Sequence, residues 1–169
     1  TSGSWQAPDG INEVLVEVWG AGGGSQAVRR DYGGGGGGGA YSNATVSVTP
    51  GNSYNYYVGT SAQGANGGDS YWVNTSTVLA KGGTVGGLSG SPGAGGSATS
   101  GVGDVRYSGG SGGTGTSSYG GGGGGGAGST GNGLSGSGRI AGGATSEYGG
   151  AGGDGFNGTS GIGSNGNLY

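Results

Sequence analysis

YGGGGGGGA occupies residues 32–40 and recurs, letter for letter, at residues 119–127. Glycine loses more conformational freedom on folding than any other residue, so a run of glycines specifies a structure poorly. The rest of the chain shares the bias, with 56 glycines among 169 residues and 28% hydrophobic residues. Because each ordered backbone position costs about 1–2 kcal/mol, the runs are either flexible linkers or parts of a structure that requires glycine.

Three kinds of structure are compatible with so much glycine. Disorder is the alternative that composition alone leaves open. A collagen triple helix needs glycine at every third position and abundant proline, whereas this chain has 3 prolines and unbroken glycine runs. Polyglycine II helices are extended rods with 3 residues per turn and a rise of ~3.1 Å, whose N–H and C=O groups pair with neighbouring rods. Since only glycine on the inward sides lets such backbones pack closely, we predict a bundle of polyglycine II rods.

Strand patterns are confined to the N-terminal half of the chain. INEVLVEVW, at residues 11–19, alternates between a valine face and a face that carries Glu13, Leu15 and Glu17. We expect further strands through Val46 and Val48 and at residues 54–58, 69–73 and 77–83, with a turn at Pro50-Gly51. Trp5, Trp19 and Trp72 are expected to fill the core of this small sheet or sandwich.

The predicted fold is mostly β plus irregular structure. No segment shows the 3.6-residue apolar period of an α-helix, so essentially no α-helix is expected. We predict one domain over residues 1–169, in which residues 1–81 are rich in strands and are interrupted by a polyglycine excursion at 20–39. Residues 82–169 are predicted to form the polyglycine II bundle, with variable loops.

Varied sequence collects next to the glycine runs, in SQAVRRDY (25–32), TGTSSY (114–119) and GSTGNGLSGSGRIAGGATSEY (128–148). If the rods share one axis, these stretches form loops at the ends of the bundle. Loops on a rigid scaffold commonly carry binding residues.

The order of several motifs resembles the glycine-rich domain that ends many bacteriophage tail fibres. They are WQAPDGINEVLVEVWGAGGGS, GGGGGGGAYSNATVSVTPGNSYNYYVG, GGDSYW, VLAKGG, GDVRYSGGSGG and GGGGGGGAG, and together they cover nearly the whole chain. The later glycine-rich part is also similar to the small adhesins that cap the long tail fibres of some T-even-type phages.

This resemblance implies a distal, host-recognising tip at the end of a phage tail fibre or of a related bacterial fibre. The expected partners are a bacterial outer-membrane protein or surface glycan and the remainder of the same fibre. Fibre shafts are typically trimeric, which implies a homotrimer, whereas the capping adhesins act as single chains. The alternative is a structural cap that ends a fibre without touching a receptor.

Composition argues against most other functions. The chain has no His or Cys, which excludes the common nucleophile–base dyads and His-containing metal sites, and we expect no enzyme activity, metal or cofactor. A glycosidase pair such as Glu13 and Glu17 lacks any sign of a cleft. The net charge of −3 argues against nucleic acid, and no apolar run is long enough to insert into a membrane. Ice binding is a further alternative, which the scattered Arg, Tyr and Glu residues disfavour.

Candidate receptor contacts are chosen from the varied stretches. They are Arg29, Arg30, Asp31, Tyr32, Ser117, Tyr119, Leu134, Arg139, Ile140, Glu147 and Tyr148. Arg makes forked hydrogen bonds to acidic groups, and Tyr offers a large contact area at modest entropic cost. The structural alternatives are a solvated turn for the charged cluster and an aromatic plate that closes the bundle for the tyrosines.

Overall fold

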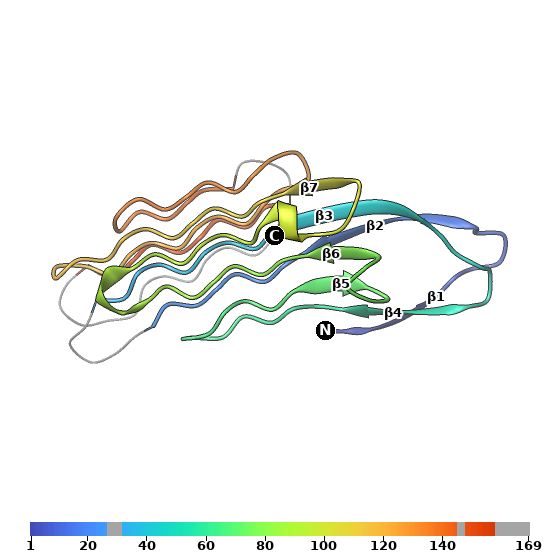
Figure 1. The fold of residues 1–169 in the computed structure, drawn as a ribbon, viewed down its shortest axis with the longest axis horizontal. Helices are drawn as coiled ribbons and strands as arrows, with labels where there is room; N and C mark the ends of the chain where they lie inside the picture. The colour runs from blue at the N-terminus through green and yellow to red at the C-terminus, as the bar shows by residue number, and fades with distance from the viewer. Residues whose placement is uncertain (27–31, 145–147, 158–169) are drawn as a thin grey trace.

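The molecule is elongated, with two β-sheets at one end and a bundle of extended rods at the other (Figure 1). The computed structural model describes residues 1–26, 32–144 and 148–157. Strands and rods run along the same long axis, and several strands continue directly into a rod. These ranges contain no α-helix, only two 3-10 turns, η1 (Leu88–Gly90) and η2 (Ala98–Ser100). None of their helical segments is therefore long and apolar enough to cross a membrane.

The strands form two antiparallel sheets. The first sheet has the order β1-β4-β5-β6, formed by Gly3–Gln6, Ser53–Tyr57, Ser70–Trp72 and Val78–Ala80. The second sheet has the order β2-β3-β7, formed by Glu13–Trp19, Tyr41–Ser47 and Val105–Tyr107. β2 packs across β5 and β6, and β3 packs on β6, so the two sheets make a small sandwich.

The alternation in β2 places valines in the core. Val16 is buried, whereas its neighbour Leu15 is 61% exposed on the outer face. Val16 joins Ala44, Trp72 and Val78 in the buried cluster, and partly buried side chains pack around it, namely Trp5, Val14, Val18, Val46 and Tyr54. The predicted mostly β fold is confirmed, and two of the three tryptophans lie in this core as expected.

Three details differ from the sequence-based predictions. Trp19 lies outside the buried cluster and packs on Tyr41, with ring centroids 5.0 Å apart. β1 was not predicted, because its four residues alternate too briefly to give a pattern. β7 was not predicted either, because it has three residues and pairs with β3 within a glycine-rich region.

The first glycine run lies inside the rod bundle, and its hydrogen bonds go to other rods. N–H groups three residues apart donate to the same neighbour: those of Gly34 and Gly37 to residues 84–87, and those of Gly35 and Gly38 to residues 110–113. The second run shows the same repeat, with Gly120, Gly123 and Gly126 donating to residues 150–156. A three-residue repeat with bonds only between rods is the pattern expected of polyglycine II.

Close backbone contact explains the glycines of the first run. A Cβ atom built at any residue from Gly34 to Gly39 would lie 1.8–2.0 Å from a backbone atom of a neighbouring rod. The second run is different, because a Cβ at Gly123 or Gly126 would meet its nearest atom at 3.4 or 3.5 Å, an ordinary contact. Both runs end at a fully buried alanine, Ala40 or Ala127. Close packing therefore requires glycine at every position of the first run. In the second run, the side of the rod that carries Gly123 and Gly126 has room for a methyl group.

Candidate functional site

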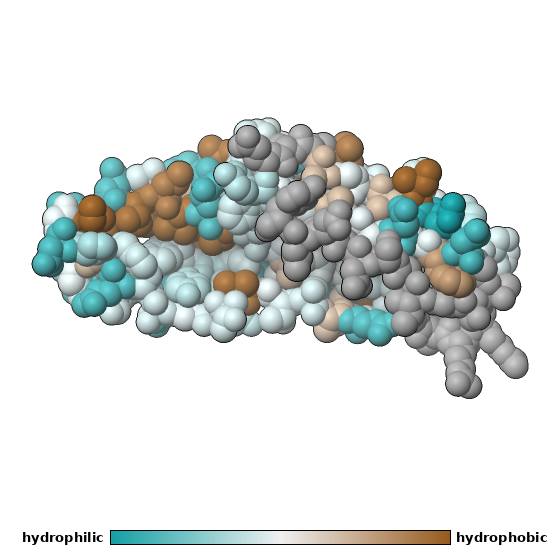
Figure 2. All heavy atoms as spheres, turned by 180° about the vertical axis from the view of Figure 1, so that it is seen from behind, coloured by the Kyte–Doolittle hydropathy of each residue, from teal (hydrophilic) through white to brown (hydrophobic). Residues whose placement is uncertain are grey.

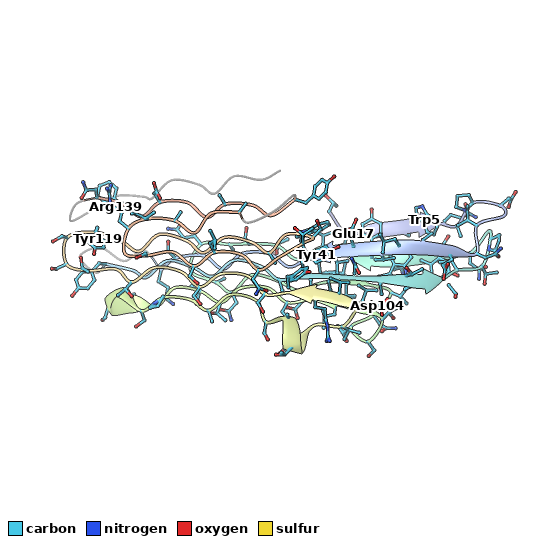
Figure 3. All side chains as sticks on the ribbon, turned by 90° about the horizontal axis from the view of Figure 1, so that it is seen from above. Trp5, Glu17, Tyr41, Asp104, Tyr119 and Arg139 are labelled. Atoms are coloured by element: carbon cyan, nitrogen blue, oxygen red, sulfur yellow. The ribbon has the colours of Figure 1, made fainter. Side chains whose placement is uncertain are left out.

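Turns from separate rods meet at the end of the bundle that lies away from the sheets. One turn is closed by the reciprocal pairing of Thr116 with Tyr119, and another by the pairing of Ser137 with Ile140. The two turns touch, because a Cβ at Gly138 would lie 3.3 Å from the Tyr119 hydroxyl. Figure 3 shows Tyr119 and Arg139 together at this end, with Trp5 and Asp104 at the sheet end. We call this surface the far end.

Two more elements complete the far end. The N–H of Gly115 donates to the carbonyl of Gly90, which places η1 beside the turn that ends at Tyr119. Gly121 donates to the carbonyl of Gly33, so Tyr32 enters its rod at the same end. The far end therefore combines segments that are distant in the sequence, and the rods between them fix their relative positions.

Among the residues that the structure describes, the far end exposes several apolar side chains and the cationic side chain of Arg139. Three large and mostly apolar side chains are exposed to solvent here: Ile140 is 67% exposed, Leu88 44% and Tyr32 38%. The guanidinium of Arg139 makes no hydrogen bond with any residue in the described ranges, and its carbonyl accepts from the N–H of Gly155. Exposed apolar area next to an exposed Arg is suited to binding a macromolecular surface, since such sites combine aromatic or aliphatic anchors with Arg.

The predicted contact residues do not all lie at the far end. Tyr119, Arg139, Ile140, Ser117 and Tyr32 do, and Ser117 is exposed in its turn. Leu134 lies on the flank of a rod, where it is 51% exposed and its carbonyl accepts from the N–H of Gly125. Arg29, Arg30, Asp31 and Glu147 lie outside the described residues.

Tyr148 lies at the opposite end of the rods, next to the sheets. Its ring meets that of Trp19 edge-on, with centroids 6.3 Å apart, and its φ of 65° is the left-handed conformation of a turn. The three tyrosines that precede glycine runs are therefore divided between the two ends, and they do not form one plate.

Leu88 was missed by sequence reasoning. It stands in GGLSGSP, a short interruption between glycine segments, and Ser89 and Gly90 both take positive φ values of 59° and 82°. The other loops were selected because varied residues stand between glycine runs. The same signal is present around Leu88, but it extends over fewer residues.

A polar cluster joins β2 to β3 where the strands pass into rods. The Tyr41 hydroxyl donates to the Glu17 carboxylate and accepts from the Asn43 amide, and the Tyr41 side chain is fully buried. Burial, reinforced by the hydrogen bond to Glu17, raises the pKa of Tyr41 to about 12. Nearby, Asp69 accepts from the N–H of Gly82 and pairs with Lys81. These groups hold the junction between sheets and rods.

The described residues bring together no group of three or more His, Cys, Asp or Glu side chains that could hold a metal ion. Glu17 is hydrogen-bonded to Tyr41, and Glu13 lies four residues away on the same exposed face of β2. Glu17 is the one carboxylate among the described residues that line the groove beside β2, so these residues do not form the facing pair of a glycosidase.

Comparison with known proteins gives one match. A family model described as a glycine-rich domain matches residues 1–168. No curated protein and no solved structure matches the chain.

Proposed function

Because the chain belongs to this glycine-rich domain family, and because its rods bring several exposed turns to one end, we propose that it is a receptor-binding fibre tip. In this proposal the sheet end connects to the remainder of a phage tail fibre or of a related bacterial fibre. The far end contacts a bacterial outer-membrane protein or surface glycan. The protein acts at the tip of the fibre, as a single chain or as a homotrimer, and by binding alone.

The observation that carries the proposal is the composition of the far end. A cap that only ends a fibre needs a closed and inert surface, whereas this surface exposes Ile140, Leu88 and Tyr32 beside the exposed side chain of Arg139. Exposed large apolar side chains that gather in one place commonly mark interaction sites. Rigid rods also lower the entropic cost of binding, because the turns need not be ordered on contact.

The test compares two exposed aliphatic residues at different places. Purified protein is labelled and its binding to intact cells of a panel of bacterial strains is measured, first unaltered and then with Ile140→Ser or Leu134→Ser. Ile140→Ser is expected to weaken binding at least about tenfold, since contact residues at the centre of an interface contribute 1–2 kcal/mol or more. Leu134→Ser is the matched control, because it removes a similar exposed side chain from the flank of a rod.

Arg139→Ser is expected to weaken binding as well, and more strongly at low salt. Unaltered protein that binds no strain, while its removal prevents fibres from assembling, would support the structural cap instead. Equal losses from Ile140→Ser and Leu134→Ser would show that the far end is not the contact surface.

A further inference from the structure

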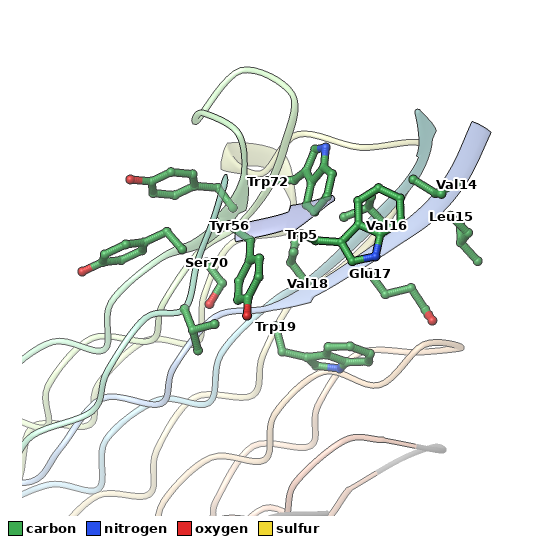
Figure 4. A pocket seen from close by; sticks show the side chains of 13 residues that line it. Trp5, Val14, Leu15, Val16, Glu17, Val18, Trp19, Tyr56, Ser70 and Trp72 are labelled. Atoms are coloured by element: carbon green, nitrogen blue, oxygen red, sulfur yellow. The ribbon is translucent and has the colours of Figure 1, made fainter. Parts of the chain in front are cut away.

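Within the described part of the chain, the sandwich has no strand opposite one half of its larger sheet. β2 and β3 pack on β5 and β6, but among the described strands none of the second sheet packs comparably on β1 or β4. A groove of ≈ 620 Å³ lies there instead, beside the edge of β2 (Figure 4). It is lined by Trp5 of β1, residues 56–58 and 70–72 of the first sheet, and residues 14–19 of the second. We call it the edge groove.

Along the edge groove, the backbone of β2 pairs with no other strand of the described ranges. Antiparallel strands pair through alternate residues, and here the even-numbered residues of β2 face β3, as the bonds from Val48 to Asn12 and from Gly20 to Ala40 show. The N–H and C=O groups of Leu15 and Glu17 therefore point away from β3 and along the groove. No residue in the described ranges bonds with them. Such an edge is a template for a further strand.

The walls of the edge groove are apolar. On the inner faces of the two sheets, Tyr56 is 36% exposed, Trp5 and Val18 are only partly buried, and the indole of Trp5 reaches towards Val16 across the gap (Figure 4). Figure 2 shows hydrophobic side chains gathered over the sheet end of the molecule. An added strand would bury this surface between the two sheets.

The charged residues beside the edge groove indicate which kind of strand could bind there. Glu13 and Glu17 are exposed on the outer face of β2, Asp9 precedes the strand, and β1 to β6 contain no Lys or Arg. If a second copy paired antiparallel with β2 around Leu15, Glu13 of one copy would stand opposite Glu17 of the other. Like charges directly opposite are destabilising, whereas opposite charges stabilise a pair of strands.

We propose that the edge groove binds an extended strand of another protein in which basic and apolar side chains alternate. The strand pairs with the N–H and C=O groups of Leu15 and Glu17 as a fourth strand of the second sheet. Its apolar side chains point inward, towards Trp5 and Tyr56, and its basic side chains lie on the outer face beside Glu13 and Glu17. This site is at the opposite end from the receptor-binding surface and does not depend on that proposal.

The test uses three synthetic peptides with the sequence acetyl-Lys-Val-Lys-Val-Lys-Val-amide. One is unmodified, one is N-methylated on its Lys amides and one on its Val amides. In the bound peptide, the Lys residues would stand opposite Leu15 and Glu17, because their side chains point to the same outer face. The Lys N–H groups would then face β2, so methylation of the Lys amides blocks the pairing. The unmodified peptide is expected to bind at about millimolar concentration and to protect the amides of Leu15 and Glu17 from exchange, as followed by NMR. The Lys-methylated peptide is expected to bind at least about tenfold more weakly, and the Val-methylated peptide to keep its affinity.

Leu15→Pro removes one N–H that faces the groove and no bond to β3, and Pro is tolerated on an edge strand. It is expected to weaken peptide binding, whereas Leu15→Thr, which keeps the N–H, is expected to retain most of it. If Leu15→Pro does not fold, the two methylated peptides still decide the question on the unaltered protein. Absence of binding, or equal binding of both methylated peptides, overturns the proposal. Protection of the Leu15 amide that depends on protein concentration without peptide would make a second copy the occupant, and would also overturn it.

Discussion

Gly36 and Gly123 are each the fourth glycine of their run, yet their surroundings differ. A Cβ at Gly36 would lie 2.0 Å from the carbonyl oxygen of Gly23, whereas a Cβ at Gly123 would be 3.4 Å from the nearest atom. Gly36→Ala is expected to lower the free energy of unfolding by at least about 3 kcal/mol, because rods must separate and lose bonds. Gly123→Ala is expected to be neutral or to stabilise by about 0.4–1 kcal/mol, since alanine restricts the unfolded chain. Urea denaturation of both variants measures the difference.

Gly124→Ala is the control within the second run, because its Cβ would lie 2.1 Å from the carbonyl oxygen of Gly110. Gly124→Ala is expected to lower the free energy of unfolding of the protein as much as Gly36→Ala does. Similar stability of all three variants would mean that the rods can move apart to admit a methyl group. The requirement for glycine was predictable from the sequence, but the tolerant positions were not, because YGGGGGGGA is the same in both runs and only the neighbouring rods differ.

Tyr41 makes the stability of the protein sensitive to alkali. Its pKa is about 12 in the folded protein and about 10 in an unfolded chain, so folding favours the neutral hydroxyl. The resulting contribution to the free energy of unfolding is fully present below pH 10 and is lost as the pH rises to 12. The loss is about 3 kcal/mol, because the two pKa values differ by two units. Unfolding measured by circular dichroism between pH 9 and 12 is expected to show this loss, and Tyr41→Phe to remove it at some cost in stability at neutral pH.

At the scale of elements, the long strands were predictable from their own alternation, whereas short strands were predictable only beside a recognisable turn. β2 alternates over seven residues and carries three valines on its inner face, so its pattern alone places its faces correctly. β5 and β6 are three residues each, and they were expected only because aromatic or aliphatic residues flank a turn. β7 has a similar length, but its pairing with β3 brings together residues more than 60 positions apart in the sequence, which no local pattern reports.

The candidate site was predictable in part for the same reason. Varied residues between glycine runs identified the turns at Tyr119 and Ile140, because such residues interrupt a rod. Which end of the bundle each turn occupies depends on the direction of its rod, and direction is set by the order of hairpins through the whole chain. Tyr119 and Tyr148 therefore look equivalent in the sequence but lie at opposite ends.

At the scale of the whole molecule, sheets and rods share their polypeptide segments. β2 continues into the rod that begins at Gly20, and the first glycine run leads into β3 through Ala40. That run is also surrounded by rods from the second half of the chain, including residues 84–87, 93–96 and 110–113. The strand-rich part and the rod bundle therefore depend on each other for burial, and neither half of the chain can complete its packing alone.

We accordingly expect the protein to unfold in one cooperative transition. Val16→Ala, in the sandwich core, is expected to destabilise by about 2 kcal/mol, and Gly36→Ala acts in the middle of the rods. Both variants should lower the temperature of the same calorimetric peak, with calorimetric and van't Hoff enthalpies that agree, because loss of either part exposes the other. Two peaks, one shifted by Val16→Ala and the other by Gly36→Ala, would show that the sandwich and the rods unfold independently. The continuity of β2, the first glycine run and β3 argues for the single peak, since a rod cannot detach without pulling on a strand that is buried in the sandwich.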